Sequence, residues 1–224
     1  MPKKNTVKLY LAGGCYHILN RGVNKRRIFL DEQDYSVFLS YIKTYLVPKD
    51  VEGLTKIIAD QAASPKQKDR ALRELQLNNF HRLITLLAYI LMANHFHFLI
   101  RQKNERDIKV FMQSLMTRYT RYFNKRHNRV GPLFESIYKA VPVESDEQLL
   151  HLTRYIHRND PRFKQPSSYP NYLGQVHQEW VKPEFILEHF LDTGFNSYRE
   201  FVESEDSETE LTTAKLAGPF YLDS

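Results

Sequence analysis

Apolar and polar positions along the chain follow two periodicities that divide it into strands and helices. Runs of apolar, aromatic and β-branched residues between turn residues predict β-strands over residues 14–21, 82–91, 95–101 and 133–143. Apolar residues at helical spacing, several preceded by capping residues, predict helices over residues 31–46, 107–127, 145–158, 182–191 and 197–202. We expect the fourth strand to be broken at Pro142, because proline lacks a backbone N–H.

The elements between residues 14 and 159 follow the order β-α-β-β-α-β-α once a segment at 47–81 is set aside. This order predicts the α+β class and the ferredoxin-like split βαβ plan, with helices packed on one face of an antiparallel sheet. The segment at 47–81 is rich in Lys, Asp, Gln and Ala, and Ser64-Pro65 begins a capped helix within it. We therefore expect it to be an inserted surface helical hairpin.

The chain is predicted to consist of a core over residues 1–160 followed by an extension. Pro161, Pro166 and Pro170 impose an irregular path after the core. We expect residues 161–202 to form a C-terminal extension that packs on or beside the core. Residues 203–224 are polar, and their composition is typical of a disordered tail.

Basic and aromatic residues are abundant in the chain of 224 residues. It has 32 Lys and Arg against 26 Asp and Glu, a net charge of +6, and 14 Tyr and 14 Phe. This balance favours a polyanionic partner, nucleic acid first of all. The single cysteine, Cys15, excludes a disulfide framework and a Cys-rich zinc site. We find neither a secretory signal nor an apolar run long enough for a membrane span, so we expect a cytoplasmic protein.

Two histidines alternate with two phenylalanines on the third predicted strand. His95 and His97 are two residues apart, so their side chains share one face, whereas Phe96 and Phe98 point to the other. Two adjacent imidazoles can hold a divalent metal ion. The pair is also compatible with two surface histidines that flank a core phenylalanine.

A tyrosine and an asparagine share one side of the helix predicted over residues 145–158. Tyr155 and Asn159 are four residues apart. The phenol of Tyr155 is a candidate nucleophile, and the amide oxygen of Asn159 is a candidate third metal ligand. Alternatively, Tyr155 is a core aromatic and Asn159 simply ends the helix, where asparagine is common.

Several segments of the chain together resemble one protein family. They are Cys15–Gly22, Ile28-Phe29 with Asp34-Tyr35, Ala88–Ile100, Gly131–Lys139, Arg154–Asn159, Ser167–Gly174 and Ser197–Val202. The chain resembles the single-tyrosine HUH transposases of insertion sequences, in particular the REP-associated tyrosine transposase branch. The resemblance covers most of the chain except residues 47–81 and the tail.

The resemblance implies a metal-dependent endonuclease and strand transferase that acts on single-stranded DNA through a 5′-phosphotyrosine. His95, His97 and Asn159 would then bind Mg²⁺ or Mn²⁺, and Tyr155 would be the nucleophile. The family reads Asn-Pro after the tyrosine helix, whereas this chain reads Asn159-Asp160-Pro161. Asp160 is therefore a candidate to replace or supplement Asn159 as a ligand.

Tyrosines and basic residues suitable for binding DNA gather on the helix predicted over 107–127 and near two other elements. Aromatic rings can stack on bases, and cations can contact phosphates. The candidates are Arg26, Arg118, Arg121, Tyr122, Lys125, Arg126 and Lys139. An aromatic core face beside a solvated basic face explains the long helix equally well. The resemblance further implies a homodimer that acts on hairpin-forming single strands.

Three other functions fit parts of the pattern. The first is a catalytically inactive, domesticated relative that only binds DNA hairpins. The second is a metal-dependent hydrolase that uses water in place of Tyr155. The third is a plasmid replication initiator, although the proline-rich C-terminal segment shows no sign of a helicase or origin-binding addition.

Overall fold

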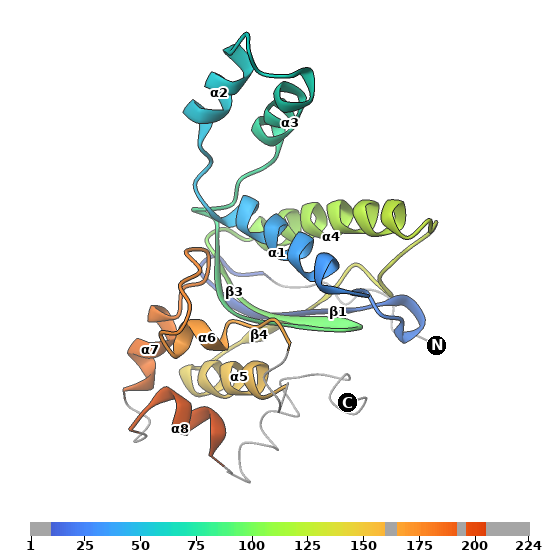
Figure 1. The fold of residues 1–224 in the computed structure, drawn as a ribbon. Helices are drawn as coiled ribbons and strands as arrows, with labels where there is room; N and C mark the ends of the chain where they lie inside the picture. The colour runs from blue at the N-terminus through green and yellow to red at the C-terminus, as the bar shows by residue number, and fades with distance from the viewer. Residues whose placement is uncertain (1–9, 160–164, 192–195, 205–224) are drawn as a thin grey trace.

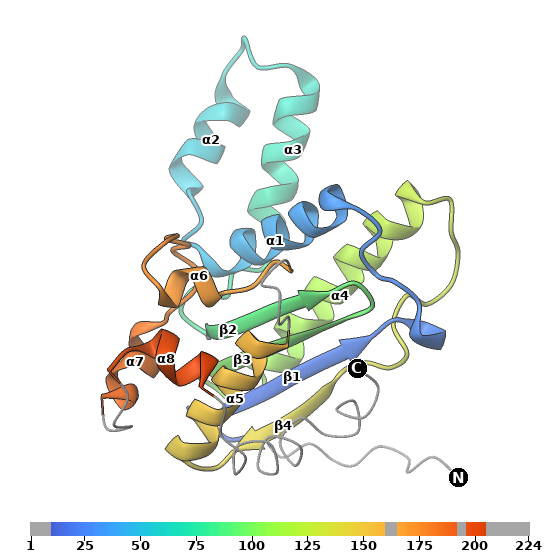
Figure 2. The same ribbon diagram turned by 60° about the horizontal axis from the view of Figure 1, so that its bottom comes forward.

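A four-stranded antiparallel sheet forms the centre of the computed structural model, which describes residues 10–159, 165–191 and 196–204. Its strands are β1 (Cys15–Arg21), β2 (Ile84–Met92), β3 (His95–Gln102) and β4 (Lys139–Val143), in the spatial order β2-β3-β1-β4. Every neighbouring pair is antiparallel. The order and directions confirm the predicted α+β class and the ferredoxin-like split βαβ plan (Figure 2).

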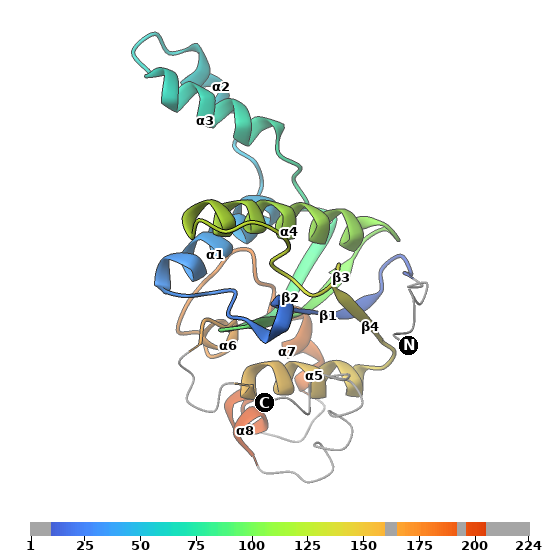
Figure 3. The ribbon, with the colours of Figure 1, turned by 90° about the vertical axis from the view of Figure 1, so that its right-hand side faces the viewer.

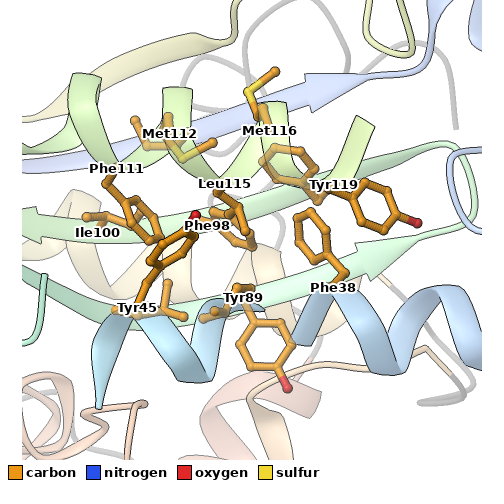
Figure 4. Packing of buried hydrophobic residues seen from close by; sticks show 14 of the residues in the cluster. Phe38, Tyr45, Tyr89, Phe98, Ile100, Phe111, Met112, Leu115, Met116 and Tyr119 are labelled. Atoms are coloured by element: carbon orange, nitrogen blue, oxygen red, sulfur yellow. The ribbon is translucent and has the colours of Figure 1, made fainter. Parts of the chain in front are cut away.

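Two long helices cover one face of the sheet. They are α1 (Glu32–Leu46) and α4 (Asp107–Arg126), and Figure 3 shows both on the same side of the strands. Asp31 caps α1, since its carboxylate accepts hydrogen bonds from the backbone N–H groups of Gln33 and Asp34. Phe98 from β3 packs among Phe38, Phe111, Leu115 and Tyr119 of these helices (Figure 4). Burial of these aromatic rings supplies the largest apolar core of the described residues.

The expectation of helices on a single face is incomplete, because a second set covers the opposite face. This set comprises α5 (Asp146–Arg158), α6 (Tyr169–Tyr172), α7 (Glu184–Phe190) and α8 (Tyr198–Glu203). Leu152 and Ile156 of α5 are fully buried in one cluster with Ile90 and Leu99 of the sheet. The sheet residues on this face are thus apolar enough to bury a second layer of helices.

Residues after α5 also close the outer edge of β2. The backbone N–H of Leu91 donates to the Pro166 carbonyl, that of Ser168 donates to Tyr89, and that of Lys182 donates to Leu86. These bonds satisfy polar groups that a free edge strand would expose. The C-terminal segment is therefore bound to the same sheet as α5. Residues 160–164 and 205–224, which include the predicted core boundary and nearly all of the predicted tail, lie outside the described residues.

A helical hairpin projects from the body of the molecule (Figures 1 and 3). It consists of α2 (Val51–Ala59) and α3 (Pro65–Gln76), within the stretch interpreted as an insertion. Ser64 and Gln67 form a reciprocal capping box at the start of α3. Only Ala71 is buried among the residues of the two helices. At the base, the Lys49 ammonium donates to the carbonyls of Leu75 and Leu77.

The fourth strand is shorter than the sequence predicted, because it begins at Lys139 and not at residue 133. The carbonyls of Ser136 and Ile137 accept hydrogen bonds from the Asn20 side chain, so they are unavailable to a strand ladder. Pro142 does not break the strand but pairs with Tyr16, which is possible because β4 is an edge strand. No helix among the described residues is long and apolar enough to cross a membrane.

Candidate active site

The two histidines lie at the start of β3, directly after the turn at Ala93-Asn94. Alternation along the strand buries Phe96 and Phe98 beneath α1 and α4 and turns His95 and His97 toward the α5 face. His97 is 1 % exposed, whereas His95 is only partly buried. The histidine pair thus lies at one end of the central part of the sheet, with His95 nearer the solvent.

Helix α5 brings the phenol of Tyr155 against these histidines within one chain. The ring centroids of Tyr155 and His97 are 5.5 Å apart, with the ring planes at 89°. A third imidazole, that of His17 on β1, lies 6.3 Å from the Tyr155 ring. Leu152 and Ile156 hold α5 on the sheet through the apolar cluster, and Figure 2 shows the helix lying over the strands. The hydrophobic stripe of α5 therefore positions the tyrosine beside the histidine pair.

His97 has one ring nitrogen in a hydrogen bond and the other without a partner. Its Nδ1 lies 2.8 Å from Nε2 of His17. Its Nε2 is buried and has no hydrogen-bond partner among the described residues. An unsatisfied buried ring nitrogen is costly in a folded protein, unless a ligand or cation completes it.

His95 has a comparable arrangement, since its Nδ1 lies 2.6 Å from the side-chain Oδ1 of Asn94. Burial and then the positive charge of Arg21 lower the pKa of His95 to about 4. Burial, followed by the charges of His17 and His95, lowers the pKa of His97 well below its usual value. Both imidazoles are therefore neutral at neutral pH, the form in which histidine coordinates a metal ion.

Asn159 occupies the C-terminal cap of α5, one helical turn after Tyr155. Its amide Nδ2 is buried without a hydrogen-bond partner among the described residues. Within the described part of the chain, no three or more His, Cys, Asp and Glu side chains are grouped so that they could hold a metal ion. A cation at His95 and His97 would thus take its further ligands from an amide such as Asn159, from water or from substrate. The alternative ligand Asp160 lies outside the described residues.

Residues 66–159 match the model of the family described as "Transposase IS200 like". Over this segment the chain is similar to that transposase family. The structure is also similar to one described as the "REP associates tyrosine transposase bound to a REP hairpin", with a TM-score of 0.48 and 10% identity over 80% of this chain and 97% of the other. No curated protein matches the sequence.

The matched segment contains nearly all of α3 together with β2, β3, α4, β4 and α5. It therefore includes both histidines, Tyr155 and Asn159. Strand β1, with His17, precedes the matched segment.

The candidate DNA-binding residues fall into two groups. Arg26 and Lys139 lie near the end of the sheet that carries the two histidines. Arg21 is at the same end, where it lies opposite His95 in the strand pairing and forms an ion pair with Glu135 (N–O 3.1 Å). Burial, followed by the charge of Arg21, lowers the pKa of Lys139. Arg26 is exposed on the loop that follows β1.

The second group lies on α4, across the sheet from α5. Two of its members, Arg121 and Lys125, are exposed to solvent. The other three have partners within the chain, because Arg126 pairs with Asp31 and Asp34, Tyr122 donates to Asp34, and Arg118 stacks on Tyr41 at 3.9 Å. These contacts explain the positions of those three side chains without reference to DNA.

Asn94, Arg21 and the side-chain partner of His97 carry no sequence motif that marks them as part of the site. That partner is His17, whose Nε2 lies 2.8 Å from Nδ1 of His97. The information that was missing is the strand register, which places Arg21 opposite His95 and Leu19 opposite His97. Alternate residues of β1, among them His17 and Arg21, lie on the same face of the sheet as His95 and His97. The sequence alone does not show that β1 is the strand beside β3.

Proposed function

We propose that this protein is a transposase, a metal-dependent endonuclease and strand transferase that cleaves single-stranded DNA through Tyr155. The observation that carries the proposal is the contact of the Tyr155 ring with His97, whose Nε2 is buried without a partner. A nucleophile and a candidate cation site are thus adjacent within one chain. This combination is what attack on a phosphodiester needs.

The donor atoms fit Mg²⁺ or Mn²⁺, with His95 and His97 as imidazole ligands and Asn159 as an amide ligand. Two neutral imidazoles and an amide leave coordination positions for water and for phosphate oxygen. A divalent cation bound there would neutralise charge on the scissile phosphate and stabilise the departing oxygen.

In the proposed reaction, the phenol oxygen of Tyr155 attacks phosphorus and displaces the 3′ oxygen of the preceding nucleotide. The O–P bond to Tyr155 forms as the P–O3′ bond breaks, the phenol proton is released to solvent, and the 3′ oxygen takes up a proton. The products are a 5′-phosphotyrosine and a free 3′-hydroxyl. A second 3′-hydroxyl reverses the step and rejoins the strand without ATP, because the phosphodiester is conserved.

The partner in this proposal is single-stranded DNA that forms hairpins. The exposed cations Arg26, Arg121 and Lys125, with Lys139, are the proposed phosphate contacts. Arg118, Tyr122 and Arg126 are proposed as secondary contacts, since each already has a partner in the fold. We also propose the homodimer and the division into a catalytic core to residue 160 and a C-terminal extension. Light scattering of the purified protein measures the oligomeric state.

A labelled single strand that forms a hairpin, incubated with the protein and Mn²⁺ and separated on a denaturing gel, tests the mechanism. A covalent protein–DNA band is expected for the unaltered protein and for Tyr41→Phe, which removes a hydroxyl outside the site. Tyr155→Phe should lose the band and keep DNA binding.

The same gel distinguishes the other candidate functions. Cleavage without an adduct indicates a hydrolase that uses water. Binding with neither cleavage nor adduct indicates a relative that only recognises hairpins. Either result overturns the proposed mechanism.

A further inference from the structure

A third imidazole, that of His17, is buried beside the histidine pair, and the proposed reaction gives it no role. We infer that His17 is a positioning residue, which fixes the ring orientation and the tautomer of His97 so that Nε2 of His97 presents its lone pair to a divalent cation. The inference rests on the proposed metal site at His95 and His97.

The pairing of β1 with β3 places the two rings in contact. In the antiparallel register, His17 lies opposite Leu99 and His97 lies opposite Leu19, so the two histidines are diagonal neighbours on one face. Their ring centroids are 5.0 Å apart, with an interplanar angle of 20°. The exposed fractions are 0 % for His17 and 1 % for His97, so water does not compete for the 2.8 Å hydrogen bond between them.

The direction of this hydrogen bond determines the tautomer of His97. A neutral imidazole has one N–H and one lone pair. If Nδ1 of His97 donates to Nε2 of His17, the lone pair of His97 is on Nε2, the buried nitrogen that has no partner among the described residues. In the reverse direction, a buried N–H would point from Nε2 with no described acceptor. Only the first arrangement allows a cation to satisfy the unpartnered nitrogen.

The two proposed ligands are oriented from different elements. The Nδ1 of His95 is bonded by the side chain of Asn94, its neighbour in the β2–β3 turn. The Nδ1 of His97 is bonded from another strand, and the Tyr155 ring lies edge-on against the His97 ring. A rotation of the His97 ring by half a turn would direct carbon toward His17 and lose the hydrogen bond. Contact with His17 therefore selects one of the two ring orientations.

His17 itself does not fit the role of a third ligand. Its Nε2 is directed at His97 Nδ1 and is engaged there. Among the described residues, His17, His95 and His97 do not form a three-ligand group able to hold a metal ion. The geometry suits an outer partner of the kind that commonly orients metal-ligating histidines.

Two substitutions of similar size separate a positioning role from a packing role. In His17→Gln, the side-chain carbonyl can accept a hydrogen bond from His97 Nδ1, whereas His17→Leu fills the space without an acceptor. Isothermal titration of DNA-free protein with Mn²⁺ measures binding independently of activity. Loss of an outer-shell partner commonly weakens metal affinity about 10- to 100-fold. We expect His17→Leu to weaken Mn²⁺ binding at least about tenfold and His17→Gln to remain within about threefold of the unaltered protein.

The tautomer can be read from the unaltered protein by NMR of ¹⁵N-labelled histidine, which needs no substitution to fold. A proton on Nδ1 of His97 is expected, and a proton on Nε2 overturns the inference. Mn²⁺ binding by a folded His17→Leu variant that is unchanged from the parent also overturns it and leaves the proposed metal site standing. If Mn²⁺ binding is absent from the parent, or survives loss of both His95 and His97, the proposed site itself is wrong.

Discussion

The side chain of His157 connects the helix that bears Tyr155 to the C-terminal segment. His157 is 1 % exposed, and its two ring nitrogens lie 2.8 Å from the Tyr198 hydroxyl and 2.8 Å from the Ser168 hydroxyl. The substitution His157→Phe keeps an aromatic ring, somewhat larger than imidazole, and removes both hydrogen bonds. It therefore tests chiefly the polar contribution of this connection, and a double-mutant cycle with Tyr198→Phe separates that contribution from packing.

Ser168 and Tyr198 each lose a hydrogen bond to His157 in this variant, but only one of them keeps another partner among the described residues. Ser168 retains a hydrogen bond from the Tyr89 N–H at 2.9 Å, so its hydroxyl stays partly satisfied. The Tyr198 hydroxyl is left in a buried aromatic environment without His157. An orphaned buried polar group costs about 1–3 kcal/mol, and a lost neutral hydrogen bond about 1 kcal/mol. We expect His157→Phe to lower the free energy of unfolding by about 2–4 kcal/mol.

Urea unfolding followed by circular dichroism measures this change, and a double-mutant cycle tests its cause. Adding Tyr198→Phe removes the orphaned hydroxyl, so the double variant should regain about 1–3 kcal/mol relative to His157→Phe alone. A loss of less than about 0.5 kcal/mol of unfolding free energy in His157→Phe would refute the reasoning. So would a double variant in which Tyr198→Phe costs as much as it costs alone in the unaltered protein.

Other predictions concern pH, packing, DNA binding and the projecting hairpin. Burial lowers the pKa of His157 to about 3, below its unfolded value of about 6.5, so the unfolded state takes up the proton first as the pH falls. The free energy of unfolding should therefore fall as the pH is lowered from about 6.5 to 3. Its slope against pH should be smaller by about 1.4 kcal/mol per pH unit in His157→Phe, and equal slopes in the two proteins would contradict this. Leu152→Ala should cost about 2–5 kcal/mol in urea unfolding, because Leu152 is fully buried against the sheet, and a cost under 1 kcal/mol would count against the packing of α5. Arg121→Gln with Lys125→Gln should reduce the salt dependence of single-strand binding by about 1.4 in the log–log slope, whereas Arg70→Gln on α3 should leave it unchanged. Replacement of residues 51–76 by a short Gly-Ser linker should leave the free energy of unfolding of the remainder within about 1 kcal/mol, since these helices bury only Ala71, and a larger loss would show that the hairpin supports the core.

The hydrophobic pattern was sufficient to predict the central fold, because its strands and helices are long and strongly periodic. The alternation of His95 and His97 with two phenylalanines assigned each side chain to a face before any strand pairing was known. The cap at Asp31 and the capping box at Ser64 were local signals, so helix starts could be read directly.

The features that sequence could not supply depend on contacts between distant segments. The irregular path over 133–138 follows from hydrogen bonds that the Asn20 side chain donates to Ser136 and Ile137, more than a hundred residues away. The second helical layer depends on apolar sheet residues such as Ile90 and Leu99 facing α5, which the order of elements does not specify. The contact between His17 and His97 depends in the same way on the register of two strands that are far apart in the chain.

Mapping the covalent linkage by mass spectrometry tests the central claim most directly. The protein is incubated with a hairpin-forming single strand and Mn²⁺, the adduct is digested with nuclease and protease, and the modified peptide is sequenced. We predict a 5′-linked nucleotide on the oxygen of Tyr155 and a free 3′-hydroxyl on the other DNA fragment. Cleaved DNA with no modified peptide, or a nucleotide attached to another tyrosine, would contradict the account.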